Sequence, residues 1–251
     1  MTTWKQQAVE QFNRVMCPSG FEIARKVVDV PGQYLENPEV GSKNFSEKLA
    51  RIRRGEVFEW PNMVALNRAL IPFIAPAKRI VNIGAGTGTF EWFASEDPEI
   101  EFVASEFDRE CVRWCRENRQ RKNITYCSDT IGDLLANRDR FDLAVSVDVI
   151  EHVSDYAEFL REFSQLADRA IVTTPNKGRR HASLTAMPPA YEQHVREWTA
   201  GEFYWVLRSF YAEVQLYAMP DVYTPVTREI GPLSTLTPLI AVCSRASPNY
   251  S

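Results

Sequence analysis

Three glycines, Gly84, Gly86 and Gly88, stand at alternate positions directly after an apolar stretch, in the segment IVNIGAGTGTF at residues 80–90. Where a strand runs into a glycine-rich turn and then a helix, the polar parts of a ligand can approach bare backbone N–H groups. The dinucleotide-binding pattern needs its third glycine one position later, where this chain has Thr89. The spacing therefore indicates a ligand-binding turn of another type. An ordinary strand-to-helix turn remains the alternative, because a glycine-rich turn alone is a weak signal.

Acidic residues follow the next two predicted strands. Glu106, in FVASEFD, can accept hydrogen bonds from both hydroxyls of a ribose, as in an adenosine-containing cofactor. The alternative is that Glu106 is simply an acidic residue at the start of a helix, before Asp108. Asp129 can accept from an adenine amino group, although Ser128-Asp129-Thr130 also fits an ordinary helix N-cap.

The longest polar cluster contains Asp148, Glu151 and His152, in VDVIEHV, and His194 lies downstream in YEQHVREW. Two carboxylates and two imidazoles can form a site for a divalent cation such as magnesium, which would lower the pKa of a substrate hydroxyl. His152 or His194 acting as a general base is the simpler functional interpretation. For each histidine, a buried ring with satisfied hydrogen bonds is the non-functional alternative.

Two segments resemble a known family. The glycine segment resembles the first motif of class I S-adenosylmethionine (SAM) methyltransferases, which has the Gly-x-Gly-x-Gly spacing. Residues 141–176, FDLAVSVDVIEHVSDYAEFLREFSQLADRAIVTTPN, resemble the fourth and fifth motifs of the small-molecule members, in particular the ubiquinone-biosynthesis O-methyltransferases. The chain departs from the family at Asn82, where an acid is usual.

The resemblance implies a role for each matched residue. The glycine turn would hold the methionine part of SAM, Glu106 the ribose and Asp129 the adenine, and Asp148 would lie near the sulfonium. Some relatives bind a metal through an Asp/Glu-x-x-Glu-His set with a later histidine, whereas many carry the Glu-His pair without a metal. The residues assigned to the cofactor in this way are Gly84, Ala85, Gly86, Gly88, Glu106, Asp129 and Asp148.

Strand and helix signals alternate from residue 78 onward, which predicts an α/β fold: a Rossmann-like, mainly parallel, seven-stranded sheet with helices on both faces. The last two strands lack a helix between them, so we expect an antiparallel strand at the sheet edge. The predicted strands are 79–83, 101–105, 124–126, 141–147, 169–173, 212–218 and 239–244, and the predicted helices lie near 89–95, 108–118, 130–136, 155–166 and 199–209.

The chain divides into a helical N-terminal extension, residues 1–75, and a SAM-binding domain, residues 76–251. Helices are expected at Thr3–Met16 and Asn62–Ile74, and the extension either covers the substrate or packs against the core. Residues 179–205 are rich in aromatic and imidazole groups that could close over an acceptor, although the tryptophans there could equally be core residues. These side chains include His181, Tyr191, Trp198, Tyr204 and Trp205.

Composition limits the class of partner. The 251 residues carry a net charge of −4, which argues against broad electrostatic binding of nucleic acid. The short basic runs, such as Arg119–Lys122, are interpreted as solvated faces. The sequence shows neither a signal peptide nor a membrane-spanning run, so we expect a cytoplasmic protein without membrane insertion. It does not indicate an oligomeric state.

Together these features predict a SAM-dependent methyltransferase that acts on a small acceptor, preferentially at a hydroxyl oxygen of a glycan, phenol or other metabolite. His152 and His194 are the predicted catalytic residues. A methyltransferase of RNA or another macromolecule and a catalytically inactive SAM-binding partner subunit are the alternatives. An NAD-linked oxidoreductase is disfavoured by the glycine spacing.

Overall fold

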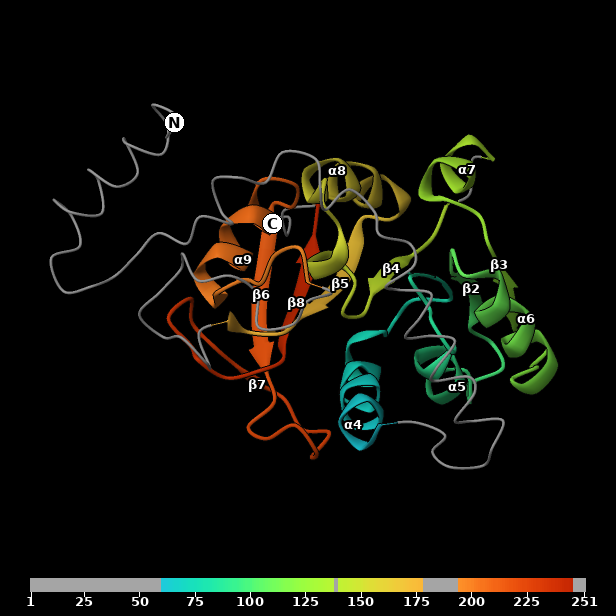
Figure 1. Cartoon of the computed structure of the whole chain (residues 1–251), viewed down its shortest axis with the longest axis horizontal. Coiled ribbons are helices and arrows are strands. Elements are labelled where there is room, and N and C mark those ends of the chain that lie inside the picture. The colour runs from blue at the N-terminus through green and yellow to red at the C-terminus, as the bar shows by residue number, and fades with distance from the viewer. Residues whose placement is uncertain (1–59, 138–139, 178–193, 246–251) are drawn as a thin grey trace, which may run out of the picture.

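The computed structural model describes residues 60–137, 140–177 and 194–245 (Figure 1). The predicted helix at 3–16 and most of the aromatic segment, including His181 and Tyr191, lie outside these residues. Within them, one mixed sheet has the order β3-β2-β1-β4-β5-β8-β6-β7. Its strands are β1 (Arg79–Ile83), β2 (Glu101–Ser105), β3 (Ile124–Cys127), β4 (Leu143–Ser146), β5 (Arg169–Thr174), β6 (Glu213–Ala218), β7 (Arg228–Glu229) and β8 (Leu239–Ser244).

The Rossmann-like α/β fold predicted from the sequence is confirmed. Strands β1 to β5 pair in parallel, β8 runs antiparallel between β5 and β6, and the short antiparallel strand β7 forms the edge beside β6. The sheet has one strand more than predicted. The two residues of β7 are both exposed, so no alternation of apolar residues could have revealed them.

Helices cover both faces of the sheet (Figure 1). Two successive residues of β1 show the division: Ile80 packs in a core with α4 and α5, and Val81 packs in the opposite core with α7, α8 and α9. The helices are α4 (Pro61–Leu70), α5 (Thr89–Ala94), α6 (Arg109–Asn118), α7 (Ile131–Ala136), α8 (Tyr156–Leu166) and α9 (Ala200–Arg208), with short 3-10 helices η1 (Ile71–Phe73) and η2 (Ile150–His152).

Helix α4 falls within the predicted extension and packs in the same core as Ile80, through Leu66 and Leu70 among others. Four helices have an N-cap at the first residue of their predicted range: Thr130 and Thr199 each form a capping box with the residue three positions later, and Asp108 and Asp155 cap α6 and α8.

Strand β4 is shorter than the predicted strand at 141–147. Before β4, Phe141 forms an isolated parallel bridge with Ala167, and the Asp142 carboxylate accepts the backbone N–H groups of Lys78 and Arg79, each at 2.8 Å. No helix among the described residues is long and apolar enough to cross a membrane.

Candidate active site

The parallel register brings the C-terminal ends of three strands together. Ile83 pairs with Ser105, and Ser105 pairs with Cys127. The Ser105 carbonyl accepts the N–H groups of Gly84 and Ala85, at 2.9 and 3.0 Å, which fixes the start of the glycine turn against β2. The predicted ligand turn therefore opens at the edge of the sheet where α/β proteins bind their ligands.

All three glycines have positive φ, which is a left-handed conformation that residues with a Cβ rarely adopt: 77° at Gly84, 56° at Gly86 and 67° at Gly88. Space is also restricted. A Cβ at Gly84 would overlap a methyl group of Val149, and a Cβ at Gly88 would lie 2.9 Å from the Tyr126 ring. The turn thus combines a backbone that favours glycine with close neighbours in the loop after β4 (Val149) and in strand β3 (Tyr126).

Glu106 lies beside this turn and is 4% exposed. Its Oε2 accepts the Gly86 N–H at 2.8 Å, and its Oε1 accepts the Asp108 N–H at 3.0 Å. Burial raises the pKa of the Glu106 carboxyl, and these backbone bonds oppose that rise. Because each carboxylate oxygen can accept a further bond, Glu106 keeps the capacity to bind the two ribose hydroxyls that the sequence predicts for it.

Asp129 follows β3 and has an exposed side chain. Its carbonyl accepts the Ser105 hydroxyl, which ties it to the end of β2. The N-cap of α7 is Thr130, with Asp133 completing the capping box, so Asp129 is not the cap of this helix. The adenine role of Asp129 stays a prediction. Phe107, 65% exposed next to Glu106, is an apolar group at this edge that the sequence analysis did not single out.

Asp148 follows β4 in a strained backbone conformation. Its φ of 52° makes it the non-glycine residue with positive φ among the described residues. The Asp148 carboxylate accepts a hydrogen bond from the Thr173 hydroxyl at 2.6 Å. The backbone N–H of Asp148 donates to the oxygen of that hydroxyl at 2.9 Å. Burial raises the pKa of Asp148, whereas the Thr173 bond and the nearby His152 lower it.

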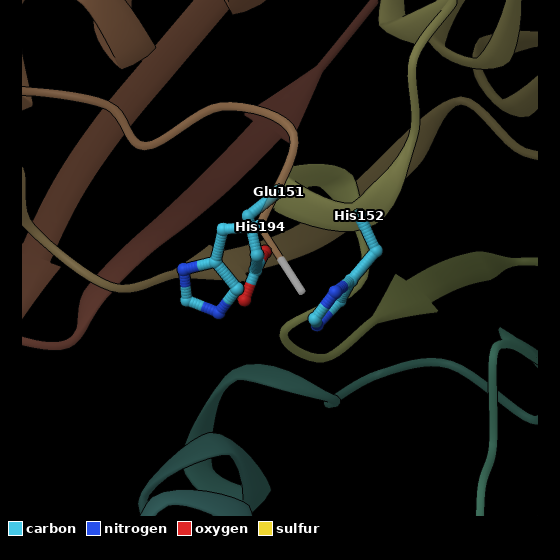
Figure 2. Close-up of side chains that lie close together, drawn as sticks. All are labelled: Glu151, His152 and His194. Atoms are coloured by element: carbon cyan, nitrogen blue, oxygen red, sulfur yellow. The ribbon is translucent and has the colours of Figure 1, made fainter. Parts of the chain in front are cut away.

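Glu151, His152 and His194 converge, as Figure 2 shows. One potential ligand atom from each lies within 4.8 Å of the others, and the two imidazole rings meet edge-to-face with their centroids 4.9 Å apart. Asp148 does not belong to this set, so the structure brings together three of the four residues predicted as metal candidates. Glu151 is buried, and His152 is exposed.

Glu151 explains why His194, distant in sequence, reaches this place. The Glu151 carbonyl accepts the N–H groups of Val195 and Arg196, at 2.7 and 3.1 Å. Its side-chain Oε2 accepts the Thr174 hydroxyl at 3.0 Å, which joins η2 to the end of β5. Burial raises the pKa of Glu151 well above its ordinary value, and the charge of Asp148 raises it further.

A buried carboxylate orients the His194 ring. His194 Nδ1 lies 2.9 Å from Glu197 Oε1, and Glu197 is 6% exposed. A ring whose Nδ1 carries the proton bound to this carboxylate presents Nε2 as a proton acceptor or a metal ligand. Sequence reasoning missed Glu197, although its position three residues after a candidate histidine is a usable signal.

Sequence reasoning also missed Thr173 and Thr174 as site residues. Their position at the end of a predicted strand, where ligands bind in this fold class, is the signal that could have indicated them. The described aromatic residues of the segment 179–205 differ in burial, which bears on whether they are core residues or could close over an acceptor. Trp198 is fully buried in the core, Tyr204 packs partly against it, and Trp205 is 68% exposed.

S-adenosylhomocysteine (SAH) is the form, without the methyl group, of the ligand that the resemblance implies. Glu106→Ala is expected to weaken SAH binding by about 1–3 kcal/mol, since it removes a charged acceptor from the ribose hydroxyls. Calorimetric titration measures the difference. Glu110→Ala, at an exposed position of α6, is the matched control and should bind as the unchanged protein does. Equal affinity of the Glu106 variant would contradict the ribose assignment.

Gly84→Ala is expected to weaken SAH binding more than Gly231→Ala does. The first variant places a Cβ against Val149 at a positive φ, where strain costs about 1–3 kcal/mol, whereas a Cβ at Gly231 meets no atom within 4 Å. Titration of both variants, with thermal melting to verify folding, tests this. A folded Gly84→Ala protein with unchanged affinity would show that the turn tolerates rearrangement.

Comparison with known proteins places this geometry in a family. Among solved structures, the chain resembles a SAM-dependent methyltransferase from Thermotoga maritima, described as a possible histamine N-methyltransferase (TM-score 0.55, 16% identity, 73% of this chain and 89% of that one). It also resembles magnesium protoporphyrin IX methyltransferase from Synechocystis PCC 6803 with bound SAH (TM-score 0.58, 14% identity, 83% and 100%). A third similar structure is the N-terminal domain of EvdMO1 with SAH and D-fucose (TM-score 0.53, 16% identity, 86% and 100%).

These identities are low, so the structural likeness establishes the fold alone. No curated protein sequence matches the chain. A family model described as a methyltransferase domain matches residues 53–215, which is more than half of the chain and includes the glycine turn, Glu106 and the Glu151 cluster. The chain therefore belongs to the methyltransferase-domain family and is a SAM-dependent methyltransferase.

Proposed function

We propose that the protein transfers a methyl group from SAM to a hydroxyl oxygen of a small acceptor. The observation that carries this proposal is the convergence of Glu151, His152 and His194 next to the cofactor turn. Val149, which packs against Gly84, lies between the strained Asp148 and η2, so one short segment adjoins both the glycine turn and the two imidazoles.

The residues present fit SAM. Positive-φ glycines leave backbone room at the turn, Glu106 offers carboxylate acceptors to ribose hydroxyls, and Asp148 offers a negative charge near the end of β4. When bound, SAM supplies a methyl group on a positively charged sulfur, which already activates it for transfer. What the protein must add is alignment of the acceptor and removal of its proton.

A hydroxyl acceptor must lose a proton when its oxygen is methylated, and this is the task that we assign to the histidines. With Nδ1 of His194 held by Glu197, Nε2 is the atom that would take the proton, and the buried carboxylate would stabilise the resulting imidazolium. His152, whose ring meets that of His194, would orient the acceptor oxygen or share this proton.

The resemblance of residues 141–176 to ubiquinone-biosynthesis O-methyltransferases supports a phenol-type or similar hydroxyl. The similar EvdMO1 domain, solved with SAH and D-fucose, supports a sugar hydroxyl equally well. The negative net charge favours a small molecule over a nucleic acid. A panel of phenols and glycosides, assayed with methyl-labelled SAM and mass analysis of the products, identifies the acceptor class and the methylated atom.

A divalent cation is a second possibility for the same three side chains. Two imidazoles and one carboxylate match the ligand set of first-row transition ions, whereas magnesium prefers oxygen ligands throughout. Ligand atoms bound at about 2.1 Å to one ion lie no more than about 4.2 Å apart, so the 4.8 Å set would have to contract slightly. The exposed His152 ring has room for that adjustment.

Two alternatives lead to different measurements. A methyltransferase acting on RNA should be retained on an RNA or heparin column at low salt, and clean flow-through would argue against it. A partner subunit without activity should bind SAH yet transfer no methyl group to any acceptor in the panel.

His194→Ala is expected to leave SAH affinity unchanged while lowering turnover by about 100-fold or more, the usual contribution of a positioned general base. Glu197→Gln should lower turnover less and shift its pH profile, because it alters the orientation and basicity of His194 without removing the ring. Arg161→Ala, at an exposed site on α8, serves as the control. Full activity of His194→Ala would remove this residue from the mechanism.

Metal addition distinguishes the two roles of the histidine pair. If a cation binds, chelator-treated protein titrated with manganese, zinc or magnesium should show saturable binding that is strongest for a transition ion and is lost in His152→Ala. Wild-type activity should then fall on chelation and return on metal addition. Full activity after chelation, with no heat of binding for any of the three ions, would leave general-base catalysis as the mechanism.

A further inference from the structure

A buried amide and a buried carboxyl face each other beneath the glycine turn. Asn82 lies in β1, two residues before Gly84, and Glu91 lies in the first turn of α5, three residues after Gly88. Asn82 Nδ2 donates to Glu91 Oε1 at 2.6 Å, and the two residues are 2% and 0% exposed. This bond therefore joins the strand before the turn directly to the helix after it.

The other oxygen of each group has no hydrogen-bond partner among the described residues. These atoms are Asn82 Oδ1 and Glu91 Oε2, and both are inaccessible to solvent. An ionised Glu91 would leave both buried oxygens, Asn82 Oδ1 and Glu91 Oε2, without a donor, which is unfavourable. A proton on Oε2 would supply a donor, and a bond from it to Oδ1 would close a ring with the Nδ2–Oε1 bond already present.

The charges around Glu91 come from three other elements. Arg119, at the end of α6, is 1% exposed and donates from Nη1 to the Gly88 carbonyl at 3.0 Å, and its positive charge favours ionised Glu91. Glu106, after β2, opposes ionisation, and Tyr126 of β3 lies within electrostatic range. Burial is the largest effect and raises the pKa of Glu91; the backbone N–H of Glu91 and the Asn82 amide lower it, and the net result is a pKa of about 7.

We propose that Glu91 is a positioning residue that holds a proton in the folded protein and forms a cyclic acid–amide pair with Asn82, which fixes the glycine turn for SAM. The pair acts through the turn and does not itself contact the cofactor. The proposal rests on the assignment of SAM to this turn and does not depend on which acceptor is methylated.

The direction of the pH effect follows from the protonated form. A carboxyl whose pKa is higher in the folded than in the unfolded protein stabilises the fold most below its unfolded value, near 4.5, and this contribution is lost as the pH rises to about 7. SAH affinity should decrease in the same direction. If only the protonated form binds, the apparent dissociation constant rises by up to about thirtyfold between about pH 6 and about pH 8.5.

Glu91→Gln tests the proposal because the glutamine amide can donate to Asn82 Oδ1 at every pH. The variant should bind SAH at about pH 6 within about twofold of the wild type, and it should lose the Glu91-dependent part of the decrease at higher pH. Glu96→Gln, at an exposed carboxyl just beyond α5, is the matched control and should keep the wild-type pH profile. A pH dependence that persists unchanged in Glu91→Gln would overturn the proposal.

Exchanging the two groups provides a further test. Asn82→Asp places two carboxyls together and should weaken SAH binding, and the double variant Asn82→Asp with Glu91→Gln should restore it, since an acid–amide pair forms again. A double variant no better than Asn82→Asp would contradict the pairing. Thermal melting establishes which variants are folded.

Infrared difference spectroscopy tests the proton directly in the wild-type protein, so the proposal stays testable even if a variant fails to fold. At about pH 6 the spectrum should contain the carbonyl stretch of buried protonated carboxyls, and a component of this band should disappear as the pH rises through about 7. That component should be missing from folded Glu91→Gln, whereas any contribution of Glu151, whose pKa burial also raises, should remain. Absence of this component in the wild type would show that Glu91 is ionised and would sink the proposal, whatever acceptor the enzyme uses.

Discussion

Strand β1 forms hydrogen bonds with two parallel neighbours, β2 on one side and β4 on the other, and its central residues are buried. Such a strand can carry few polar side chains, because both faces of the sheet are covered. Polar groups accumulate instead where the strands end, and parallel pairing places those ends at one edge. The glycine turn, Glu106, Asp129 and Asp148 are neighbours for this reason, although they span 65 residues of sequence from Gly84 to Asp148.

Glu151 has a comparable role on the acceptor side. Its backbone carbonyl binds the segment that follows His194, its side chain binds the end of β5, and its neighbour His152 meets the His194 ring. One residue thus links a 3-10 helix, a strand end and a distant loop. We infer that Glu151 is needed for the assembly of the histidine pair whether or not a cation binds there.

Much of the fold could be predicted from the sequence, since apolar strands alternate with helices whose N-caps are chemically marked, as at Thr130 and Thr199. The glycine spacing and the acid after the second strand likewise predicted a cofactor edge, and the structure places the glycine turn and Glu106 together there. The two-residue strand β7 has no pattern to detect. The Asp148 carboxylate bonds to Thr173 and does not belong to the Glu151–His152–His194 set, a distinction that sequence spacing cannot reveal.

Arg119 illustrates a different limit. Within a basic run it was interpreted as part of a solvated face, yet it is almost fully buried, with its guanidinium near the rings of Trp92 and Trp114 and bonded to the Gly88 carbonyl. Charge patterning along one helix cannot anticipate a partner on another element. The same limit applies to the Asn82–Glu91 pair: Asn82 was noted in the sequence as a departure from the family pattern, but its bond to Glu91 on α5 could not be read from the sequence.

The placement of β8 between β5 and β6 has a consequence for biosynthesis. Strand β5 ends at Thr174 and strand β6 at Ala218, and the two do not pair with each other. Each pairs instead with β8, residues 239–244. During synthesis, two strand edges therefore stay open until the last strand of the sheet has left the ribosome, and open edges are templates for unwanted pairing between chains. A nascent chain that stops short of residue 239 would expose both edges at once. Truncation before residue 239 should therefore favour aggregation of the chain.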